Sequence, residues 1–195
     1  MITCLANKKD ATQIAKIHQQ EINQGFLSQL GIKFLSKLYE ATIVSPNAFT
    51  VIAKDNDKVI GFISGCINVS KFYRDFYKKY VANTFLILVP KIFRISVLKK
   101  IFETIRYPRQ KEKKLPEAEL LTIVVLKSFH GQGIAPKMFE KFLSEMRKRG
   151  VRRFKVVVGK KLKRAIGFYE KVGFKFCSSI SVHQGEPSRI YIYTL

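Results

Sequence analysis

Hydrophobic and polar positions in the first part of the chain alternate between the spacing of strands and the spacing of helices. Asp10 and Gln13 form a capping-box-like start for a helix with isoleucines on related faces, and a second helix is expected to follow Gly31. Two extended runs then flank residues 55–57 (Asp-Asn-Asp), whose turn chemistry predicts a hairpin. The expected elements are a strand over residues 2–6, a helix from residue 10 that carries Ile22, a helix that ends before residue 45, and a hairpin within residues 48–69.

The second part of the chain begins with residues 71–116, a segment that is aromatic, basic and helical in pattern. Its apolar positions recur at mixed helical spacings and Pro90 interrupts them, so the pattern predicts two helices. Beyond this segment, strand and helix patterns alternate again. The expected elements are strands over residues 119–126 and 154–158, helices over residues 134–149 and 162–172, and two closing strands over residues 174–182 and 189–194.

The length and composition indicate one folded domain over residues 1–195. Of these residues 47% are hydrophobic, which is enough to bury a substantial core without disulfides or metal. The formal net charge is +22, and the basic residues are concentrated in residues 71–114 and 127–175. Such a charge attracts phosphate-bearing cofactors, acidic carrier proteins, nucleic acid or a membrane surface, although a lysine-rich solvated surface explains it equally well.

The sequence lacks the signals of several other classes of protein. Its cysteines, Cys4, Cys66 and Cys177, are far apart and without CxxC spacing, so we expect neither a disulfide framework nor a metal site. The first residues do not follow the pattern of a secretory signal, and the longest apolar run, residues 85–89, is much shorter than the roughly 20 residues that span a bilayer. We therefore expect a cytoplasmic protein, with attachment to a membrane surface as the alternative that the charge leaves open.

Residues 129–135, Phe-His-Gly-Gln-Gly-Ile-Ala, connect an expected strand to an expected helix. The first turn of a helix presents unpaired N–H groups and a partial positive charge, and glycines let a phosphate approach the backbone. This pattern predicts a phosphate site at the start of the helix. A tight strand-to-helix turn also requires glycine, so the two glycines have a purely structural explanation as well.

Together with a later segment, residues 165–176 (AIGFYEKVGFKF), this connection resembles the GNAT superfamily of acetyl-CoA-dependent N-acetyltransferases. The family's phosphate motif is Arg or Gln, two residues, Gly, one residue, and then Gly or Ala. Its slots are filled here by His130, Gly131, Gln132, Gly133, Ile134 and Ala135. The resemblance implies an α/β (α+β) fold with a mixed, mostly antiparallel central sheet of about seven strands flanked by helices. Residues 71–116 would then be a helical insertion, because the family usually has a short connection there.

The resemblance also implies roles for individual residues. The strand around Val124 and Val125 should hydrogen-bond the pantetheine arm and the thioester carbonyl, while the amides of residues 131–135 hold the pyrophosphate. Tyr169 would protonate the departing thiolate, although a tyrosine that packs the last helix is the structural alternative. Glu119 stands at the spacing of the general base in histone-acetylating relatives, although an ordinary charged residue at the start of a strand explains it too.

Two positions depart from the family pattern. His130 replaces Arg or Gln, which makes side-chain help to the phosphates weaker or sensitive to pH. Leu162 replaces an asparagine that assists the cofactor arm in many relatives. Neither change removes the backbone amides, so acetyl-CoA remains the expected co-substrate, with no metal.

The function that the resemblance implies is transfer of an acetyl group from acetyl-CoA to a primary amine of a small molecule or amino sugar, by direct attack. The acceptor molecule would be recognised by residues 71–116, for which a cap over apolar surface is the alternative. The runner-up function is an acyltransferase that takes its acyl group from an acidic acyl-carrier protein. A non-enzymatic module that binds nucleic acid or a membrane surface comes third, and nucleic acid is the partner we favour least.

Overall fold

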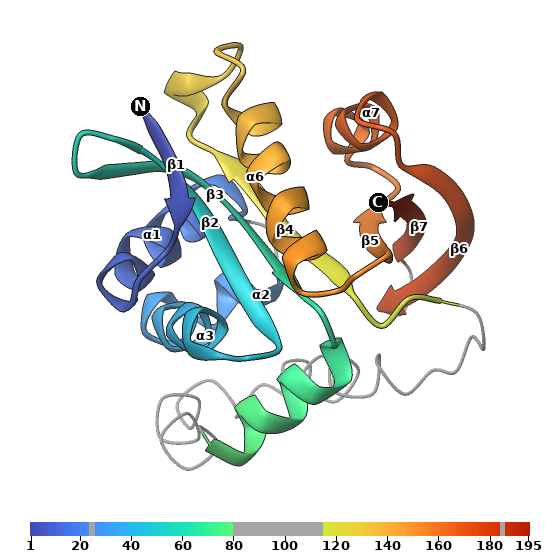
Figure 1. Cartoon of the computed structure of the whole chain (residues 1–195), viewed down its shortest axis with the longest axis horizontal. Helices are drawn as coiled ribbons and strands as arrows, with labels where there is room; N and C mark the ends of the chain where they lie inside the picture. The colour runs from blue at the N-terminus through green and yellow to red at the C-terminus, as the bar shows by residue number, and fades with distance from the viewer. Residues whose placement is uncertain (24–25, 80–114, 184–185) are drawn as a thin grey trace.

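The computed structural model describes residues 1–23, 26–79, 115–183 and 186–195. Its strands are β1 Ile2–Leu5, β2 Ala48–Asp55, β3 Lys58–Cys66, β4 Glu119–Val125, β5 Arg153–Gly159, β6 Lys175–His183 and β7 Glu186–Thr194. Its helices are α1 Ala11–Glu21, α2 Phe26–Gln29, α3 Ile32–Val44, α6 Ile134–Lys148 and α7 Lys163–Lys171, with short 3-10 turns η1 Lys8–Asp10 and η3 Lys127–Phe129. Residues 69–79 are also helical and form the unlabelled green helix of Figure 1.

The strands and helices expected within the described residues are all present, with differences at their ends. Helix α1 ends at Glu21 because the backbone of Ile22 leaves the helical region, and the short helix α2 was not predicted. Strand β7 begins at Glu186, earlier than expected, because its pairing with β6 extends to that residue. Of the two helices expected over residues 71–116, the first stretch is helical, and residues 80–114, with the expected break at Pro90, lie outside the described residues.

The strands form one seven-stranded sheet in the order β1-β2-β3-β4-β5-β7-β6. Neighbouring strands are antiparallel except for β4 and β5, which are parallel. The prediction of a mixed, mostly antiparallel sheet of about seven strands flanked by helices is therefore confirmed. The parallel pair lies in the middle of the sheet, with β1, β2 and β3 on one side and β6 and β7 on the other (Figure 1).

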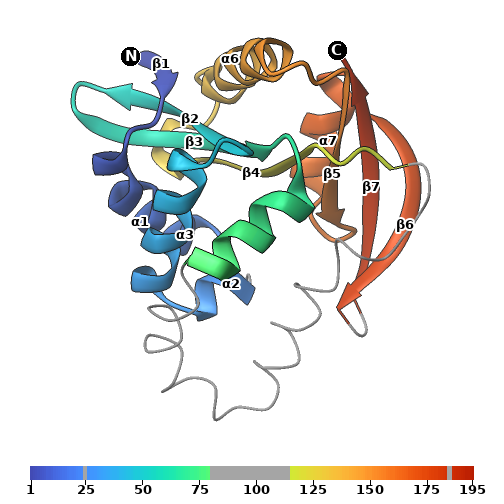
Figure 2. The ribbon, with the colours of Figure 1, turned by 60° about the horizontal axis from the view of Figure 1, so that its bottom comes forward.

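Helices cover both faces of this sheet. Figure 2 shows α6 on one face of β2, β3 and β4, and α1, α2 and α3 on the opposite face. Helix α6 lies there because its apolar side chains recur at helical spacing on one side, and that side is buried. The buried apolar side chains of α6 are Ile134, Met138, Phe139, Phe142, Leu143 and Met146. Helix α7 packs beside α6, with the rings of Phe139 and Phe168 6.0 Å apart.

Helix α6 packs tightly on the sheet at Gly65 of β3. A Cβ atom added at Gly65 would lie 2.6 Å from Cε2 of Phe142, closer than carbon atoms can pack. The ring of Phe142 also lies 5.1 Å from that of Phe49 and 5.6 Å from that of Phe154, measured between centroids. Because Gly65 has no side chain, the ring of Phe142 can pack against β2, β3 and β5.

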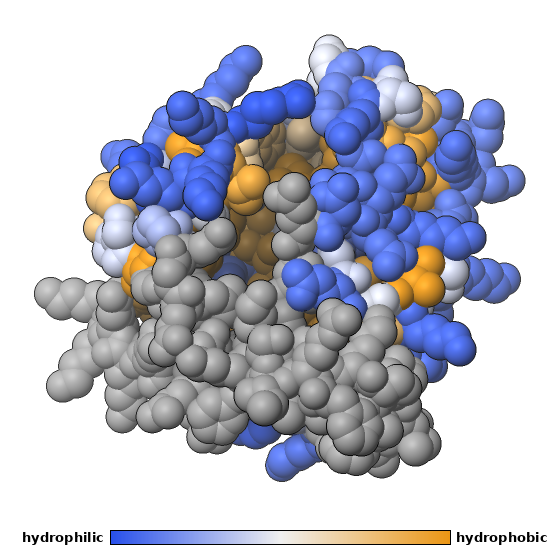
Figure 3. All heavy atoms as spheres, turned by 180° about the vertical axis from the view of Figure 1, so that it is seen from behind, coloured by the Kyte–Doolittle hydropathy of each residue, from blue (hydrophilic) through white to orange (hydrophobic). Residues whose placement is uncertain are grey.

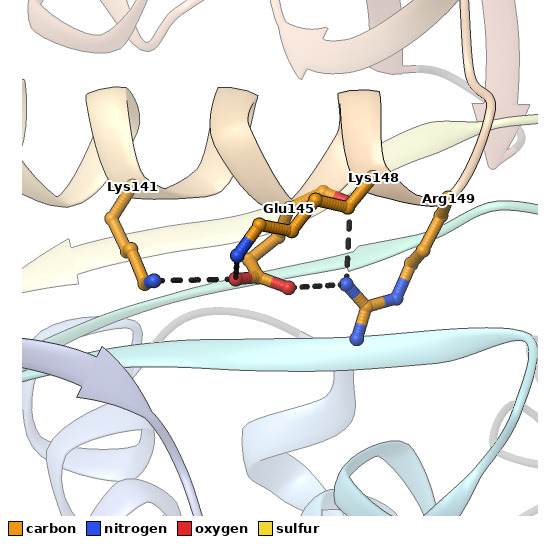
Figure 4. A network of polar contacts seen from close by, with 4 residues as sticks. All are labelled: Lys141, Glu145, Lys148 and Arg149. Carbon is orange, nitrogen blue, oxygen red and sulfur yellow. Dashed lines mark hydrogen bonds and ion pairs between the residues drawn. The ribbon is translucent and has the colours of Figure 1, made fainter.

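A buried carboxylate gathers three cations at the end of α6 (Figure 4). Glu145 accepts a hydrogen bond from the guanidinium of Arg149, and its Oε1 lies 3.2 Å from Nζ of Lys141 and 3.6 Å from Nζ of Lys148. Burial alone would raise the pKa of Glu145, but Arg149 and Lys141 outweigh it and hold that pKa below its ordinary value. Arg149 also stacks over the ring of Phe49, so the network attaches the end of α6 to β2.

The helix of residues 69–79 packs against α3. Phe72 and Phe76 are buried in a small apolar cluster with Phe34 and Leu38, and the rings of Phe34 and Phe76 meet edge to face at 6.2 Å. This part of the expected insertion is thus joined to the helices that cover the sheet.

We predict that replacing Gly65 by alanine destabilises the fold, because the new methyl group must displace Phe142 from a filled core. The expected loss is about 1–3 kcal/mol in the free energy of unfolding, measured by chemical denaturation. Gly167→Ala is the matched control, since Gly167 lies within α7 and a Cβ there meets nothing within 4 Å. The control should gain about 0.5–1 kcal/mol. Equal effects of the two substitutions would contradict the close contact at Gly65.

Candidate active site

Two glycines turn the chain from β4 into α6. Gly131 and Gly133 have φ angles of +80° and +72°, in the left-handed region that side chains other than glycine rarely adopt. A Cβ added at either position would meet nothing within 4 Å. The glycines are therefore required by backbone conformation rather than by close packing, and the space in front of them is open to a ligand.

The same connection presents backbone N–H groups without partners. Gly133 is the N-cap of α6, and no side chain caps that end of the helix. The N–H groups of Gly131, Gln132 and Gly133 have no hydrogen-bond partner among the described residues, and those of Ile134 and Ala135 belong to the first helical turn, where none is available within the helix. Residues 131–135, which we call the cradle, are suited to an anion such as a diphosphate.

His130 links the cradle to both β4 and α7. Its Nε2 lies 2.9 Å from the carbonyl oxygen of Val125, and its Nδ1 lies 3.3 Å from Nη2 of Arg164. Because the carbonyl only accepts hydrogen bonds, Nε2 carries the hydrogen and Nδ1 accepts from the guanidinium. The departure at position 130 thus brings a cationic side chain, Arg164, to the edge of the cradle. No motif pointed to Arg164, whose contact with His130 is made by folding.

Strand β4 separates from β5 shortly after the two strands meet. Their pairing is confined to Glu119 with Lys155 and Leu120 with Val156, whereas β3 stays paired with β4 as far as Val125. The register between β3 and β4 also shifts here, so that Leu121 is an extra residue on β4. Beyond this bulge, the edge of β4 that faces β5 is unpaired. Val124 and Val125 lie on this open stretch.

Glu119 is buried where β4 and β5 are still paired. The residue is 7% exposed, and its Oε2 lies 3.5 Å from Nζ of Lys155, which donates a hydrogen bond of 2.6 Å to the carbonyl of Pro116. Oε2 itself has no hydrogen-bond partner among the described residues. Burial raises the pKa of Glu119, and Lys155 opposes that rise without cancelling it. A buried carboxylate with a free lone pair and a raised pKa is the chemistry of a general base.

Glu119 lines a pocket of about 170 Å³ on the face of the sheet that α2, α3 and residues 69–79 cover. Its polar lining consists of Tyr39, Thr42, Ser64, Glu119 and Thr122. The rest of the lining is Leu27, Leu38, Phe72, Tyr73, Leu121 and Val157. Seen from behind, the molecule is hollowed over hydrophobic residues, with hydrophilic side chains along parts of the rim (Figure 3).

One wall of the pocket is an uncharged chain of hydrogen bonds. The hydroxyl of Tyr39 lies 2.6 Å from Nδ1 of His18 and is also hydrogen-bonded to Thr122. Burial lowers the pKa of His18 to about 4, so its imidazole is neutral near pH 7 and accepts from the tyrosine. Burial also raises the pKa of Tyr39, which keeps the phenol protonated. No motif in the sequence pointed to this series of hydrogen bonds, which joins three separate elements.

Tyr169 is buried on α7 and packs edge to face on Phe174, with the ring centroids 5.3 Å apart. Burial raises its pKa, so the phenol carries its proton at neutral pH and can donate it. The packing agrees with the structural alternative, and the raised pKa makes the phenol a weaker acid than an exposed tyrosine. Leu162 is the N-cap of α7, where it is 58% exposed and offers no side-chain cap to the helix.

The fold and this arrangement define an acetyltransferase. A model of the acetyltransferase (GNAT) family matches residues 17–174. The chain belongs to this family and is an N-acetyltransferase, and the family uses acetyl-CoA as acetyl donor.

Solved structures of the same family have the same fold. An acetyltransferase from Thermus thermophilus is 13% identical, with a TM-score of 0.60 over 100% of this chain and 98% of that one. An aminoglycoside 6'-N-acetyltransferase in complex with coenzyme A is 14% identical, with a TM-score of 0.61 over 100% and 97%. A ribosomal-protein-alanine N-acetyltransferase from Brucella melitensis is 12% identical, with a TM-score of 0.64 over 100% of each chain. No curated protein sequence matches this chain.

Two further observations concern the described residues alone. Within them, no helix has both the length and the apolar character needed to cross a membrane. The same residues contain no group of three or more His, Cys, Asp or Glu side chains that could hold a metal ion.

Proposed function

We propose that this enzyme transfers the acetyl group of acetyl-CoA to a primary amine of a small molecule or amino sugar by direct attack. The observation that carries the proposal is the position of β4. One end of this strand leads into the cradle, its middle has an unpaired edge, and its other end places Glu119 in a pocket. A thioester laid along β4 would therefore have its phosphates at one end and an acceptor amine with a base at the other.

The described residues fit acetyl-CoA as co-substrate. The unpartnered amides of the cradle offer hydrogen bonds to the diphosphate, and the guanidinium of Arg164 adds positive charge beside them. The open backbone edge around Val124 and Val125 offers donors and acceptors to the pantetheine arm and to the thioester carbonyl. Bound acetyl-CoA would supply an activated acyl group with a thiolate leaving group.

Proton transfer is assigned to two side chains. Only a neutral amine can attack, and exposing the lone pair of an amine of pKa about 10.4 costs roughly 4–5 kcal/mol at pH 7. Glu119, directly or through water, takes the proton of the amine as the new carbon–nitrogen bond forms. Backbone amides of β4 polarise the carbonyl, and Tyr169 gives its proton to the sulfur as the carbon–sulfur bond breaks.

The cradle is tested by Gly133→Val with Gly150→Val as matched control. Gly133 and Gly150 lie beyond opposite ends of α6, both have φ of +72°, and a Cβ at either meets nothing within 4 Å. A valine strains both backbones alike, but only the first substitution disturbs the cradle amides. We expect Gly133→Val to weaken coenzyme A binding by about tenfold or more in isothermal titration calorimetry, and Gly150→Val to leave it unchanged. Equal affinities in the two variants would refute the cradle.

The base is tested by Glu119→Gln, with Glu117→Gln as control because Glu117 is exposed. We expect Glu119→Gln to lower kcat/KM by roughly 10²-fold or more. A base works deprotonated, so activity of the wild-type enzyme should fall as pH drops through the raised pKa of Glu119, nearer neutral pH than for an ordinary carboxyl. The variant should lose this limb of the pH–rate profile. If the profile kept its shape in Glu119→Gln, the base would be another group.

The acid is tested by Tyr169→Phe, with Tyr193→Phe as control. Both tyrosines pack on Phe174, so each substitution removes one hydroxyl from the same aromatic cluster. We expect kcat to fall roughly 10²-fold in Tyr169→Phe while the affinity for acetyl-CoA stays the same, because the hydroxyl acts only on the departing sulfur. A parallel loss of affinity and turnover, or a loss matched by the control, would make Tyr169 a packing residue.

A further inference from the structure

We propose that the Glu119 pocket selects acceptor molecules with one amine on an uncharged, largely apolar body and rejects amines with a second positive charge. The inference rests on the proposed acetyl transfer and narrows its substrate class. It is drawn from the charges and hydrogen bonds of the residues that line the pocket.

The described lining offers one carboxylate to a charged nitrogen. Glu119 lines the cavity, and its Oε2 is buried without a hydrogen-bond partner among the described residues, with Nζ of Lys155 3.5 Å away. An unsatisfied buried carboxylate oxygen is costly unless a ligand satisfies it. An amine of the acceptor molecule would supply the missing N–H donor at the position from which Glu119 can take its proton.

A second ammonium group would find no second carboxylate in the described lining. Glu119 is the one acidic residue of the described lining, and Lys155 at 3.5 Å already offsets its charge. The hydroxyl of Thr42 already donates a hydrogen bond of 2.8 Å to the carbonyl of Leu38. The side chains of Tyr39 and Thr122 are hydrogen-bonded to each other. Burying a cation without an anionic partner is strongly unfavourable, so an additional charge in this pocket opposes binding.

The remaining lining favours an apolar body. Leucines from α2, α3 and β4, Phe72 and Val157 surround the space near Glu119. Contact with these side chains stabilises a hydrocarbon group in proportion to the apolar area that is removed from water. The net charge of +22 acts in the same direction, because it repels a polycation before it reaches the pocket.

This selectivity separates the chain from a structural neighbour. The aminoglycoside 6'-N-acetyltransferase shares the fold, and aminoglycosides as a chemical class carry several amines. A pocket with one carboxylate, whose charge Lys155 partly offsets, is poorly matched to such polycations. We therefore expect the two proteins to share the fold but to act on different acceptor molecules.

The test compares hexylamine with 1,6-diaminohexane, which have the same carbon chain and differ by one amine. Acetyl transfer is followed by release of coenzyme A thiol at two ionic strengths, with the full-length chain. We expect kcat/KM to be at least about tenfold higher for hexylamine, and the difference to persist at high salt because it arises in the pocket. Equal values, or a preference for the diamine, would overturn the proposal.

A second measurement tests whether a carboxylate added to the pocket changes the selectivity between the two amines. Tyr73 lines the pocket from the helix of residues 69–79, across from β4. Tyr73→Glu adds a carboxylate there, and Tyr73→Gln is its uncharged control of equal size. The ratio of kcat/KM for the diamine to that for hexylamine should rise about tenfold in Tyr73→Glu relative to Tyr73→Gln. An unchanged ratio would mean that the acceptor molecule binds elsewhere.

Calorimetry separates failure of this inference from failure of the proposed function. Coenzyme A binding is measured first, and hexylamine is then titrated into the complex with coenzyme A. Loss of coenzyme A binding would count against acetyl transfer itself. Intact coenzyme A binding without any binding of hexylamine would overturn the assignment of the pocket alone.

Discussion

The divergence of β4 from β5 is the constraint on which the rest of the molecule depends. The two strands share hydrogen bonds only near Glu119 and Leu120, while β3 holds β4 along its whole length. The far edge of β4 therefore keeps backbone groups that no neighbouring strand satisfies. An unpaired polar backbone in a sheet is costly unless a ligand or water occupies it, which makes this edge the natural position of an extended, amide-containing arm.

Because β4 diverges from β5, its two ends have different chemical properties. At its C-terminal end the strand continues into the cradle, where two glycines have positive φ and the N–H groups of residues 131–133 have no partner among the described residues. At its N-terminal end the strands are still together, so Glu119 is enclosed beside Lys155 and becomes a buried, partly neutralised carboxylate. The bulge at Leu121 lies between these regions and lets Glu119, Leu121 and Thr122 line the same pocket.

The environment of the charged side chains differs between parts of the fold. On α6 a single buried carboxylate, Glu145, collects three cations and joins the helix to β2. Beside the pocket, the hydrogen-bonded pair of His18 and Tyr39 is neutral, because burial keeps His18 unprotonated and Tyr39 protonated. At the cradle Arg164 is held by His130 and remains available to an anion. A strongly basic chain thus contains a pocket whose described lining has one charged side chain, Glu119.

Local pattern in the sequence was enough to predict the strands and helices of the described residues except the short helix α2, because spacing and turn residues act over a few positions. It also located the cradle, since a need for glycine at positive φ is decided within the turn itself, and it marked Glu119, Tyr169 and His130 as candidates. Only the tertiary structure decided that Glu119 is buried with a free oxygen, that Arg164 meets His130, and that Tyr39 joins His18 to Thr122. These contacts connect residues far apart in the chain, and the pKa of a carboxyl or imidazole depends on what surrounds it after folding rather than on its neighbours in sequence.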